Sequence, residues 1–351
     1  GGVHVSVEIC AILPTHNRAH LLPAVLAGLE AQTLPSEKFE IIAIDDGSTD
    51  DTQRMLAQWM YRLPIRVQWQ RHAGLANAKN LGVLLARGRI VVFLDDDDVA
   101  HPDLLFAHLA AHIRHPEREV AVLGRTVLAA EVAVKPLMRH VTEVGNQLFS
   151  YGWMQPGQWL SHAEFWGGRS SCKRTLLVTH GLFQPEFTFG CEDIELGWRL
   201  KSQGLRVVYE PKALATMIRS ITFDEFCARS YRQGRSQQVF AQLHPDAEVR
   251  AYCEIDTALA TWPRRKMDYA AHLRWTRKLD AVATVRAEAG LPAVPEFQQA
   301  LDSAYREAFA LSRMKGVSDM SGQFQMQTLA PQRTDNEFRS ALDYGLPAHM
   351  N

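Results

Sequence analysis

Cysteine is scarce in this 351-residue chain, which has five cysteines and no CxxC pair. An odd number of scattered thiols argues against a zinc site or a disulfide framework, and it favours a reducing compartment. The chain also lacks an apolar run of the roughly 18 residues that a membrane-spanning helix needs. We expect no signal peptide either. These absences point away from membrane-embedded and disulfide-stapled classes of protein.

The sequence has no excess of charge of either sign. Lys and Arg number 38, Asp and Glu number 39, and the formal net charge is -1. A nucleic-acid partner is therefore not expected, because such proteins usually carry a basic surface. No internal repeat is present. Hydrophobic residues make up 46% and charged residues 22% of the chain, which is typical of globular proteins. The length predicts two domains, or one large domain with an extension.

The first 125 residues alternate between two kinds of segment. Short apolar or β-branched runs have the length and composition of strands, and they occupy residues 7–13, 39–44, 65–69, 90–94 and 120–123. Between them, apolar residues recur at helical spacing in residues 20–32, 55–60, 73–86 and 102–113. This alternation predicts parallel strands joined by right-handed helical crossovers.

Polar clusters follow three of these predicted strands directly. They are residues 14–17, 45–48 and 95–98, and the last cluster consists of four aspartates. In an open parallel sheet the ligand site lies beyond the carboxyl ends of the strands, so we expect the three clusters to form one site. Its carboxylates suit a divalent cation and a nucleotide. The pattern therefore favours an enzyme.

The second half of the chain has a different character. Residues 126–190 are irregular and rich in glycine and large aromatic side chains. These aromatic residues are either core residues or platforms on which sugar rings stack, and the sequence leaves both readings open. From residue 223 onward, helical patterns cover residues 223–240, 267–287 and 298–311. The polar tail after Gly316 is expected to be mobile.

Six motifs occur in order along the chain: PTHNR at 14–18, DDGSTD at 45–50, GLANAKNLG at 74–82, FLDDDD at 93–98, EDIEL at 192–196 and YRQGRS at 231–236. In this order and spacing they resemble the family-2 glycosyltransferases of the GT-A fold. The resemblance extends from about residue 7 to residue 236. Each motif alone is a weak signal, and their combination carries the resemblance.

The resemblance implies an α/β fold with a GT-A-type, Rossmann-like, mostly parallel sheet flanked by helices. We expect residues 1–220 to form the nucleotide-sugar-binding and catalytic domain. Residues 221–351 are expected to form a mainly helical C-terminal extension on the acceptor side. The implied reaction moves a sugar, with inversion, from a nucleotide-diphosphate sugar to a hydroxyl of a glycan, lipid or small molecule. A uridine carrier is the favoured donor nucleotide.

The resemblance also assigns roles at the donor site. Asp46 would accept a hydrogen bond from the base, and His16 would pack on it. Asp97 would bind Mn²⁺ or Mg²⁺, and Asp95 or Asp96 would contact the ribose or a coordinated water. The full set of predicted nucleotide-binding residues is Pro14, Thr15, His16, Asp45, Asp46, Lys79, Asp95 and Asp96. The alternative for the aspartate run is a solvated turn or a set of helix caps.

Lys79 departs from the family pattern, which usually has Arg at this position. Lysine carries a compact charge without the two-pronged geometry of a guanidinium, but it can still meet a nucleotide carbonyl or a phosphate. We therefore predict that Lys79 faces the ligand. Asn80, beside it, is expected to support the local backbone.

The motif at 192–196 carries the predicted catalytic residues. Attack of a hydroxyl on an anomeric carbon needs a base within hydrogen-bond reach, and the transition state resembles an oxocarbenium ion. By the resemblance, Asp193 is this base and Glu192 orients the acceptor or donor sugar. The alternative is that these acids only complement a helix dipole, a role that we assign to Glu195. Asn17 and Asp50 are likewise expected to cap helices.

A second departure concerns the metal. Many relatives carry a histidine near the position of Met217, and none is present here. Water or Arg219 could take its place, or the metal dependence could be weaker. Residues 231–236 are interpreted as a flexible basic segment that closes over the diphosphate, and Arg169 as a further ligand of a phosphate or carboxylate. Closure would exclude water and limit hydrolysis of the donor.

Two other functions remain open at this point. One is a nucleotidyltransferase, and the other is a catalytically inactive nucleotide-sugar-binding or scaffold protein of the same fold. We expect a cytoplasmic protein. Peripheral contact with the inner face of a membrane, through basic residues at 264–266 and 274–278, is one reading of those charges, and solvated helix faces are the other. The sequence leaves the oligomeric state, including a homo-oligomer, open.

Overall fold

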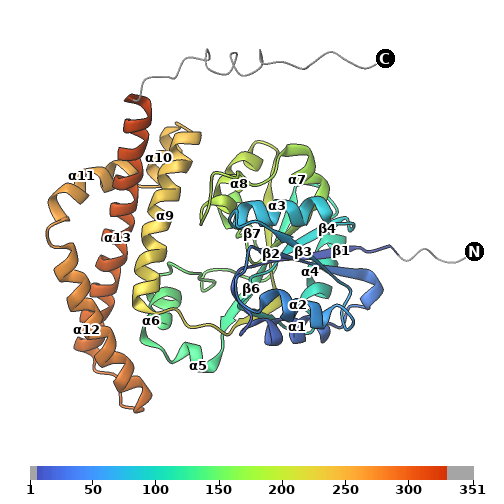
Figure 1. Ribbon diagram of the computed structural model, residues 1–351, viewed down its shortest axis with the longest axis horizontal. Helices are drawn as coiled ribbons and strands as arrows, with labels where there is room; N and C mark the ends of the chain where they lie inside the picture. Colours follow the sequence, from blue (N-terminus) through green and yellow to red (C-terminus); the bar gives the residue numbers. More distant parts are fainter. Residues whose placement is uncertain (1–5, 330–351) are drawn as a thin grey trace, which may run out of the picture.

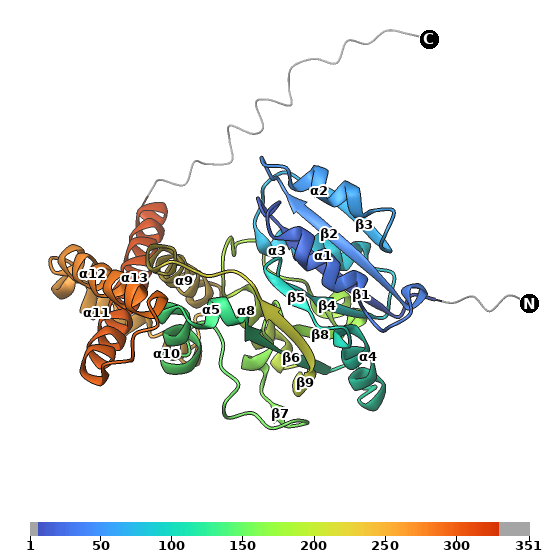
Figure 2. The same ribbon diagram turned by 90° about the horizontal axis from the view of Figure 1, so that it is seen from below.

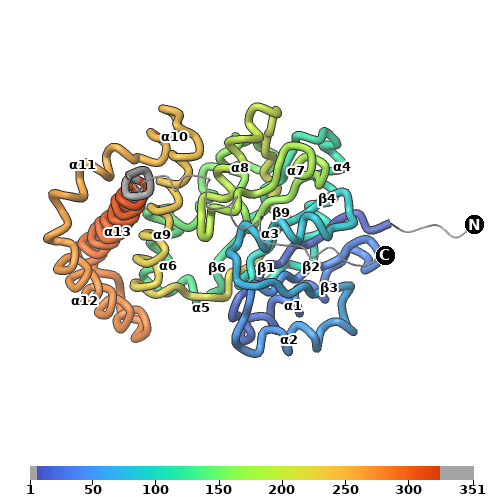
Figure 3. Tube along the Cα trace, turned by 45° about the horizontal axis from the view of Figure 1, so that its top comes forward, coloured from blue at the N-terminus to red at the C-terminus, as the bar shows by residue number. Residues whose placement is uncertain are grey.

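The computed structural model describes residues 6–329 of the chain (Figure 1). Within these residues a nine-stranded sheet with flanking helices is followed by a group of helices, α9 to α13. Figures 2 and 3 show that this helical group lies to one side of the sheet rather than over one of its faces. The predicted fold class is confirmed, whereas the boundary at residue 220 stays a prediction.

The four strands at one side of the sheet are all parallel and lie in the order β3-β2-β1-β4. They correspond to the first four predicted strands. Their bounds are β1 Ile9–Thr15, β2 Phe39–Asp46, β3 Ile65–Gln70 and β4 Ile90–Phe93. Because they are parallel, their carboxyl ends meet at one edge of the sheet, as the sequence predicts.

The rest of the sheet is mixed, which the alternation of the first 125 residues did not show. The order continues β4-β8-β6-β9-β5, and β7 pairs with β9. The pairs β4–β8, β6–β8, β5–β9 and β7–β9 are antiparallel, and β6–β9 is parallel. The bounds are β5 Asp98–Ala100, β6 Val120–Leu128, β7 Trp159–Leu160, β8 Ser170–Lys173 and β9 Arg206–Met217.

Helices cover both faces of the sheet because successive strand residues point to opposite faces. On one face, alternate strand residues such as Ile9, Ala11 and Leu13 pack under α1, α2 and α4. On the other, Cys10 and Ile12 pack under α3, α7 and α8. The bounds are α1 Leu22–Glu30, α2 Thr52–Trp59, α3 Leu75–Leu85, α4 Leu104–Arg114, α7 Arg174–His180 and α8 Glu192–Lys201.

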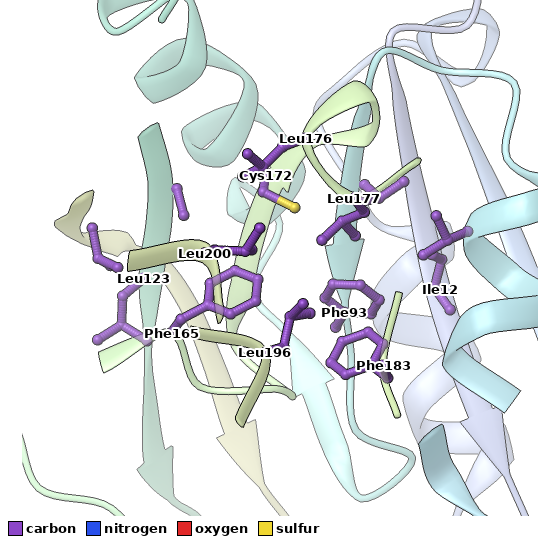
Figure 4. Close-up of a cluster of buried hydrophobic side chains, with 14 of the residues drawn as sticks. Ile12, Phe93, Leu123, Phe165, Cys172, Leu176, Leu177, Phe183, Leu196 and Leu200 are labelled. Atoms are coloured by element: carbon purple, nitrogen blue, oxygen red, sulfur yellow. The ribbon is translucent and has the colours of Figure 1, made fainter. Parts of the chain in front are cut away.

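The core under α8 supports the site described below. Figure 4 shows Leu196 and Leu200 of α8 beside Phe165, with Phe93 of β4 close to Phe183. The rings of Phe93 and Phe183 meet edge to face, with centroids 5.2 Å apart. This packing fixes α8, and hence its first turn, against the sheet.

Some of the aromatic residues of the irregular middle region belong to the core, and a platform role for the exposed ones stays a prediction. Phe165 is fully buried, and the ring of Tyr151 stacks on that of Tyr209. Trp153 and Trp159 are about half exposed. Short elements lie in this region: α5 Ala130–Ala133, α6 Pro136–Arg139, the π-helical turn η2 His140–Val144 and the 3₁₀ turn η3 His162–Glu164; another 3₁₀ turn, η1 Ser36–Lys38, precedes β2.

The helical group consists of α9 Phe223–Leu243, α10 Ala247–Tyr252, α11 Ile255–Arg265, α12 Tyr269–Glu288 and α13 Pro295–Leu329. α9 and α13 run side by side in the same direction (Figure 1). Their backbones approach closely at Gly234 and Gly316, where an added Cβ would lie about 2 Å from a carbonyl oxygen of the other helix. A larger residue at either position would force the two helices apart.

Two expectations for this region were wrong: a last helix at residues 298–311 and a mobile tail after Gly316. The final helix begins at residue 295 and extends to 329, so the tail from Gly316 to 329 is helical. Residues 330–351 lie outside the described part of the chain. The polar residues after Gly316 suggested the end of the helix. In the structure, some of them bond to α9 instead, as Asp319 does with Tyr231 and Gln323 with Arg235.

Other features of the described residues bear on the predicted compartment and membrane contact. The five cysteines are buried free thiols. Among residues 6–329, no helix is long and apolar enough to cross a bilayer. Two of the basic residues considered for membrane contact, Arg265 and Arg277, pair with Glu307 and Asp224.

Candidate active site

The loops after β1, β2 and β4 converge at one edge of the sheet. His16 donates from Nδ1 to the carbonyl oxygen of Asp46 at 2.8 Å. The backbone N–H of Thr49 donates to Oδ1 of Asn17 at 2.8 Å. Arg18 lies 3.4 Å from a carboxylate oxygen of Asp96. The three polar clusters therefore form one site, as their positions after parallel strands predict.

Asn17 does not cap α1. Its φ of 52° is left-handed, and its side chain instead joins the loops after β1 and β2. Asp50 accepts a hydrogen bond from the backbone N–H of Thr52, the first residue of α2. It thus satisfies a free N–H group at the start of that helix, as expected. Asn80 exchanges two hydrogen bonds with the backbone of Phe183, which is the supporting role predicted for it.

The carboxylate of Asp46 is buried and already has several donors. It accepts hydrogen bonds from the side chain of Gln70 at 2.7 Å and from the backbone N–H groups of Ala73 and Gly74 at 2.8 and 3.0 Å. Burial raises the pKa of Asp46, but the hydrogen bonds lower it by more than burial raises it. The net shift of this pKa is therefore downward. Asp46 thus fixes the loop between β3 and α3.

His72, which the sequence analysis did not single out, completes this wall of the site. Its Nδ1 lies 2.9 Å from a carboxylate oxygen of Asp46, and its ring lies against that of His16 with centroids 4.4 Å apart. The loop after β2 needs a glycine at position 47, because a Cβ there would lie 2.6 Å from the backbone nitrogen of His72. The two imidazoles form an aromatic surface beside the ends of β1 and β2. Thr15 and Pro14 are buried beneath it.

The aspartate run divides into residues with different partners. Asp97 forms an ion pair with Arg219 at 3.0 Å, and Asp95 lies 3.5 Å from Arg169. Burial and the neighbouring charge of Asp97 raise the pKa of Asp96 to about 6. Arg169 therefore meets carboxylates, one of the two partners predicted for it. Arg219, one of the replacements considered for the missing histidine, thus contacts the predicted metal ligand Asp97.

Asp98, the last residue of the run, belongs to β5 and is buried. Its carboxylate accepts a hydrogen bond from Thr126 at 3.2 Å and lies 3.8 Å from Arg169. Burial raises the pKa of Asp98 well above its ordinary value. Its contacts are those of a structural residue, since they join β5 to β6.

The first turn of α8 carries the acidic pair. Glu192 is buried and accepts a hydrogen bond from Nζ of Lys79 at 2.9 Å. Asp193 is partly exposed, and its two oxygens accept hydrogen bonds from the backbone N–H groups of Gly167 at 2.7 Å and Ile194 at 2.8 Å. Burial and the charge of Glu192 raise the pKa of Asp193 to about 6, although Lys79 opposes the shift. Such a carboxylate is ionised but basic near neutral pH.

Lys79 does not face open solvent. Its side chain is 2% exposed, and its ammonium lies beneath the acidic pair and near the ring of Phe183. Burial lowers the pKa of Lys79, but the charges of Glu192 and Asp193 raise it, and the net shift is upward. The structure therefore places this residue under the acidic pair, and its contact with a nucleotide stays a prediction. Its lack of a branched guanidinium suits the confined space beside Gly167.

Two glycines form the floor between the aspartate run and the acidic pair. A Cβ on Gly167 would lie 2.4 Å from Nζ of Lys79, and one on Gly168 would lie 2.1 Å from Oδ2 of Asp95. The two glycines are adjacent, so Asp95 and Asp193 lie on neighbouring parts of one surface. The absence of side chains at these two positions allows the side chains of Lys79 and Asp95 to approach the backbone closely.

The variant Gly168→Ala tests this floor. The added methyl group must displace the carboxylate of Asp95, so we expect UDP affinity to fall by about tenfold. Titration calorimetry with UDP measures the effect. Gly152→Ala is the matched control, because nothing lies within 4 Å of a Cβ at that position. Equal UDP affinity in the two variants would show that the position of Asp95 does not matter for nucleotide binding.

Two arginines of α9 point to the same region. Arg229 and Arg232 both stack on the ring of Phe189. Their guanidinium carbons lie 5.1 and 4.1 Å from the centre of that ring. Burial lowers the pKa of Arg229, and the nearby charge of Asp95 opposes this effect. Among the described residues no acidic side chain forms an ion pair with either guanidinium. Arg229 was missed in the sequence because it precedes the motif at 231–236.

The motif at 231–236 is not a flexible segment. It lies inside the 21-residue helix α9, and its residues bind α13 through Tyr231 and Asp319 at 3.0 Å and through Arg235 and Gln323 at 3.0 Å. A separate closing movement of these residues would break the helix. The expectation of a local lid is therefore wrong.

Comparison with solved structures defines the class of fold. Residues 1–349 of TarS from Staphylococcus aureus share it with a TM-score of 0.51 at 16% identity, over 91% of this chain and 92% of that one. The mannosyltransferase PcManGT from Pyrobaculum calidifontis, in complex with GDP-Man and Mn²⁺, gives a TM-score of 0.54 at 20% identity, over 91% and 87%. At such identities the likeness concerns the fold, which is that of GT-A glycosyltransferases.

The sequence comparisons point to one family. Residues 10–173 match the family model of glycosyl transferase family 2. A validoxylamine A glucosyltransferase of Streptomyces hygroscopicus subsp. jinggangensis is 32% identical over 223 residues, covering 56% of this chain and 52% of the relative. A poly-beta-1,6-N-acetyl-D-glucosamine synthase of Staphylococcus aureus is 27% identical over 217 residues, covering 60% and 50%. The chain thus spans about half the length of these relatives.

Proposed function

We propose that this protein transfers a sugar, with inversion, from a UDP-sugar to a hydroxyl group of an acceptor, with Asp193 as the general base. The observation that carries the proposal is the position of Asp193, a partly exposed carboxylate that two backbone N–H groups hold beside the aspartate run. The match of residues 10–173 to the family model supports the class of reaction. TarS in complex with UDP-GlcNAc, which shares the fold, makes a uridine donor the first to test.

The nucleotide would lie at the ends of β1 and β2. The imidazoles of His16 and His72 offer a surface for the base, and Asp46 holds the loop that borders it. The contact between Asp46 and a ring N–H of the base stays a prediction. It would have to share an oxygen that already accepts a backbone hydrogen bond, which a carboxylate oxygen with two lone pairs permits.

The diphosphate would lie between the aspartate run and α9. Arg229 and Arg232 have no ion-pair partner among the described residues, and they are held by Phe189 rather than by a carboxylate. Guanidinium groups suit phosphate oxygens because they offer several N–H donors in a fixed plane. We infer that these two residues contact the diphosphate directly and remain in place as part of α9.

The residues present fit a divalent cation that the donor helps to hold. No cluster of three or more His, Cys, Asp or Glu side chains suited to a metal occurs among the described residues. Mg²⁺ and related ions often use only one or two carboxylates together with substrate phosphates, and Asp97 and Asp95 supply such hard oxygen ligands. When bound, the cation would neutralise charge on the leaving diphosphate. Arg219 would share or release Asp97 at that stage.

The transfer step uses the chain's own residues as follows. Asp193 accepts the proton of the acceptor hydroxyl while the oxygen attacks the anomeric carbon from the side opposite the diphosphate, which inverts the configuration. Glu192 and Lys79 form a buried ion pair beneath it and set the local potential. The arginines of α9 stabilise the charge that develops on the leaving group.

The variant Asp97→Ala tests the cation site. We expect Mn²⁺ to raise the affinity of the wild-type protein for UDP and the variant to lose this gain, by about tenfold. Calorimetric titration with and without Mn²⁺ measures the difference. Asp103→Ala is the control, because Asp103 lies at the exposed start of α4 and hydrogen-bonds Thr33. An unchanged gain in Asp97→Ala would remove this residue from the cation site.

A screen of UDP-, GDP- and TDP-sugars by thermal shift, with and without Mn²⁺, tests the donor. Product analysis then separates the enzyme classes, since a glycosyltransferase releases a nucleoside diphosphate and a nucleotidyltransferase releases pyrophosphate. We expect a stabilising UDP-sugar and release of UDP. Binding without release against a broad acceptor panel would instead support an inactive binding protein, and no binding of any nucleotide sugar would contradict the proposal.

A further inference from the structure

A pocket of about 230 Å³ lies beside the first two turns of α8, away from the aspartate run. It is lined by residues of the turn η3, of α8, and of α9 and α10 of the helical group, and Figure 3 shows α10 next to α8. It therefore lies between the sheet domain and the helices. Its lining residues are His162, Ala163, Ile194, Trp198, Phe240, Glu248 and Tyr252.

The walls of the pocket are largely apolar and aromatic. Ile194 and Trp198 are four residues apart and lie on one face of α8. Phe240 is fully buried beneath them, and the ring of His162 meets that of Trp198 at a centroid distance of 5.9 Å. Such a wall offers a flat surface to the C–H face of a ring.

Polar groups stand at the rim. Glu248 pairs with Lys201 at 3.2 Å, and the Lys201 ammonium lies 4.7 Å from the centre of the Trp198 ring. Burial and the charge of Lys201 lower the pKa of His162, which leaves a neutral imidazole that can donate and accept. Tyr252 adds a hydroxyl and is about half exposed. The combination of an aromatic wall with several hydrogen-bonding groups suits a ring with many hydroxyls more than an acyl chain.

The pocket adjoins the proposed base. Ile194 follows Asp193 directly, and its backbone N–H is one of the two groups that hold the Asp193 carboxylate. Burial raises the pKa of Tyr252, and the charges of Cys191 and Asp193 add to the shift. In the proposed reaction a ring in this pocket would be an acceptor, since the donor is assigned to the aspartate run and the arginines of α9.

We propose that this pocket binds the polyhydroxylated six-membered ring of the acceptor, with Trp198 as its stacking surface. The inference rests on the proposed function, because it takes Asp193 to be the base. It narrows the acceptor from any hydroxyl compound to a saccharide or cyclitol. The helical group would then take part in acceptor binding, since α9 and α10 line the pocket.

The test uses binding, so that it does not depend on turnover. The probes are the methyl glycosides of glucose, N-acetylglucosamine, mannose and galactose, together with myo-inositol, and sodium decanoate represents an acyl chain. Saturation-transfer NMR is measured on the wild-type protein, Trp198→Ala and Trp275→Ala. Trp275 is the matched control, because it is 58% exposed on α12 and does not line the pocket.

We expect at least one ring to give a signal with the wild type and Trp275→Ala, and affinity for it to fall about tenfold in Trp198→Ala. Equal signals in all three proteins, no ring signal at all, or a signal from decanoate alone would overturn the proposal. Should Trp198→Ala not fold, Tyr252→Ala serves in its place, because Tyr252 is 53% exposed. UDP titration of the same samples keeps the two ideas apart: UDP binding without ring binding contradicts only the pocket, and failure to bind UDP contradicts the proposed function.

Discussion

Replacing Asp193 by asparagine is expected to lower kcat by about 10²–10⁴-fold, the usual contribution of a general base. The amide has the shape of the carboxylate but cannot accept the acceptor's proton. Affinity for UDP should stay within about twofold of the wild type, since we propose that Asp193 acts on the acceptor and not on the nucleotide. Release of UDP from the donor, in the presence and absence of an acceptor, measures the rate.

The hydrogen bonds of Asp193 decide how this variant must be controlled. Both carboxylate oxygens accept a backbone N–H, and an amide has one oxygen, so one of the two N–H groups loses its acceptor. That loss costs about 1–3 kcal/mol where the group stays buried. Thermal unfolding must therefore be measured beside activity. Asp224→Asn, which changes an exposed acid paired with Arg277, is the matched control.

The pH dependence gives a second and independent reading of the same residue. With a pKa of about 6, Asp193 is ionised at neutral pH, and acidification below that value protonates it. The rate of the wild-type enzyme should then fall tenfold for each pH unit below about 6. The residual rate of Asp193→Asn should lack this limb. A wild-type rate that is flat down to pH 5, or an Asp193→Asn enzyme with normal kcat, contradicts the assignment.

The parallel part of the fold was predictable from the sequence because local signals agree there. In β1, β2 and β4 a short apolar run is buried on both faces, and a polar cluster marks the end of each strand. The antiparallel strands β5, β7 and β8 were not predicted. β7 has two residues and β5 three, and β8 reads Ser170-Ser171-Cys172-Lys173, which has no apolar alternation. Pairing with neighbours fixes these strands, and sequence patterns do not record it.

The site shows the same division between local and distant information. The convergence of the clusters at Asp46, Asp95 and Asp193 follows from topology and motif order. The partners of the charged groups do not, because they lie far apart in sequence: Lys79 and Glu192 are separated by 113 residues, and Asp97 and Arg219 by 122. A lysine in a nucleotide-binding motif suggested a ligand contact, which stays a prediction. Its carboxylate partner, Glu192, is visible only in the structure.

The buried pair of Lys79 and Glu192 supports the second large effect that we expect. Lys79→Met should lower the free energy of unfolding by about 3–5 kcal/mol, since it leaves the Glu192 carboxylate buried without its counter-ion. Chemical denaturation measures the loss. The control is Lys315→Met, which removes a partly exposed pair with Asp319 and should cost about 0–1 kcal/mol.

The pH profile distinguishes a purely structural role of Lys79 from a role in setting the basicity of Asp193. The charge of Lys79 holds down the pKa of Asp193, against the effects of burial and of Glu192. Removing that charge should raise the pKa of Asp193 and move the acid limb of the rate profile of Lys79→Met toward neutral pH. A merely destabilised enzyme would lose activity without any movement of the limb.

The double variant Lys79→Met with Glu192→Gln separates these contributions. Without the buried carboxylate, the penalty for an unpaired charge disappears, so the double variant should be more stable than Lys79→Met alone. The second charge that raises the pKa of Asp193 is also gone, and the acid limb should return toward that of the wild type. If stability recovers but the limb stays displaced, the charge of Glu192 does not act on Asp193, and Lys79 alone accounts for the shift of the limb. If both recover, the opposite charges of the buried pair offset each other at Asp193, and the same pair stabilises the fold.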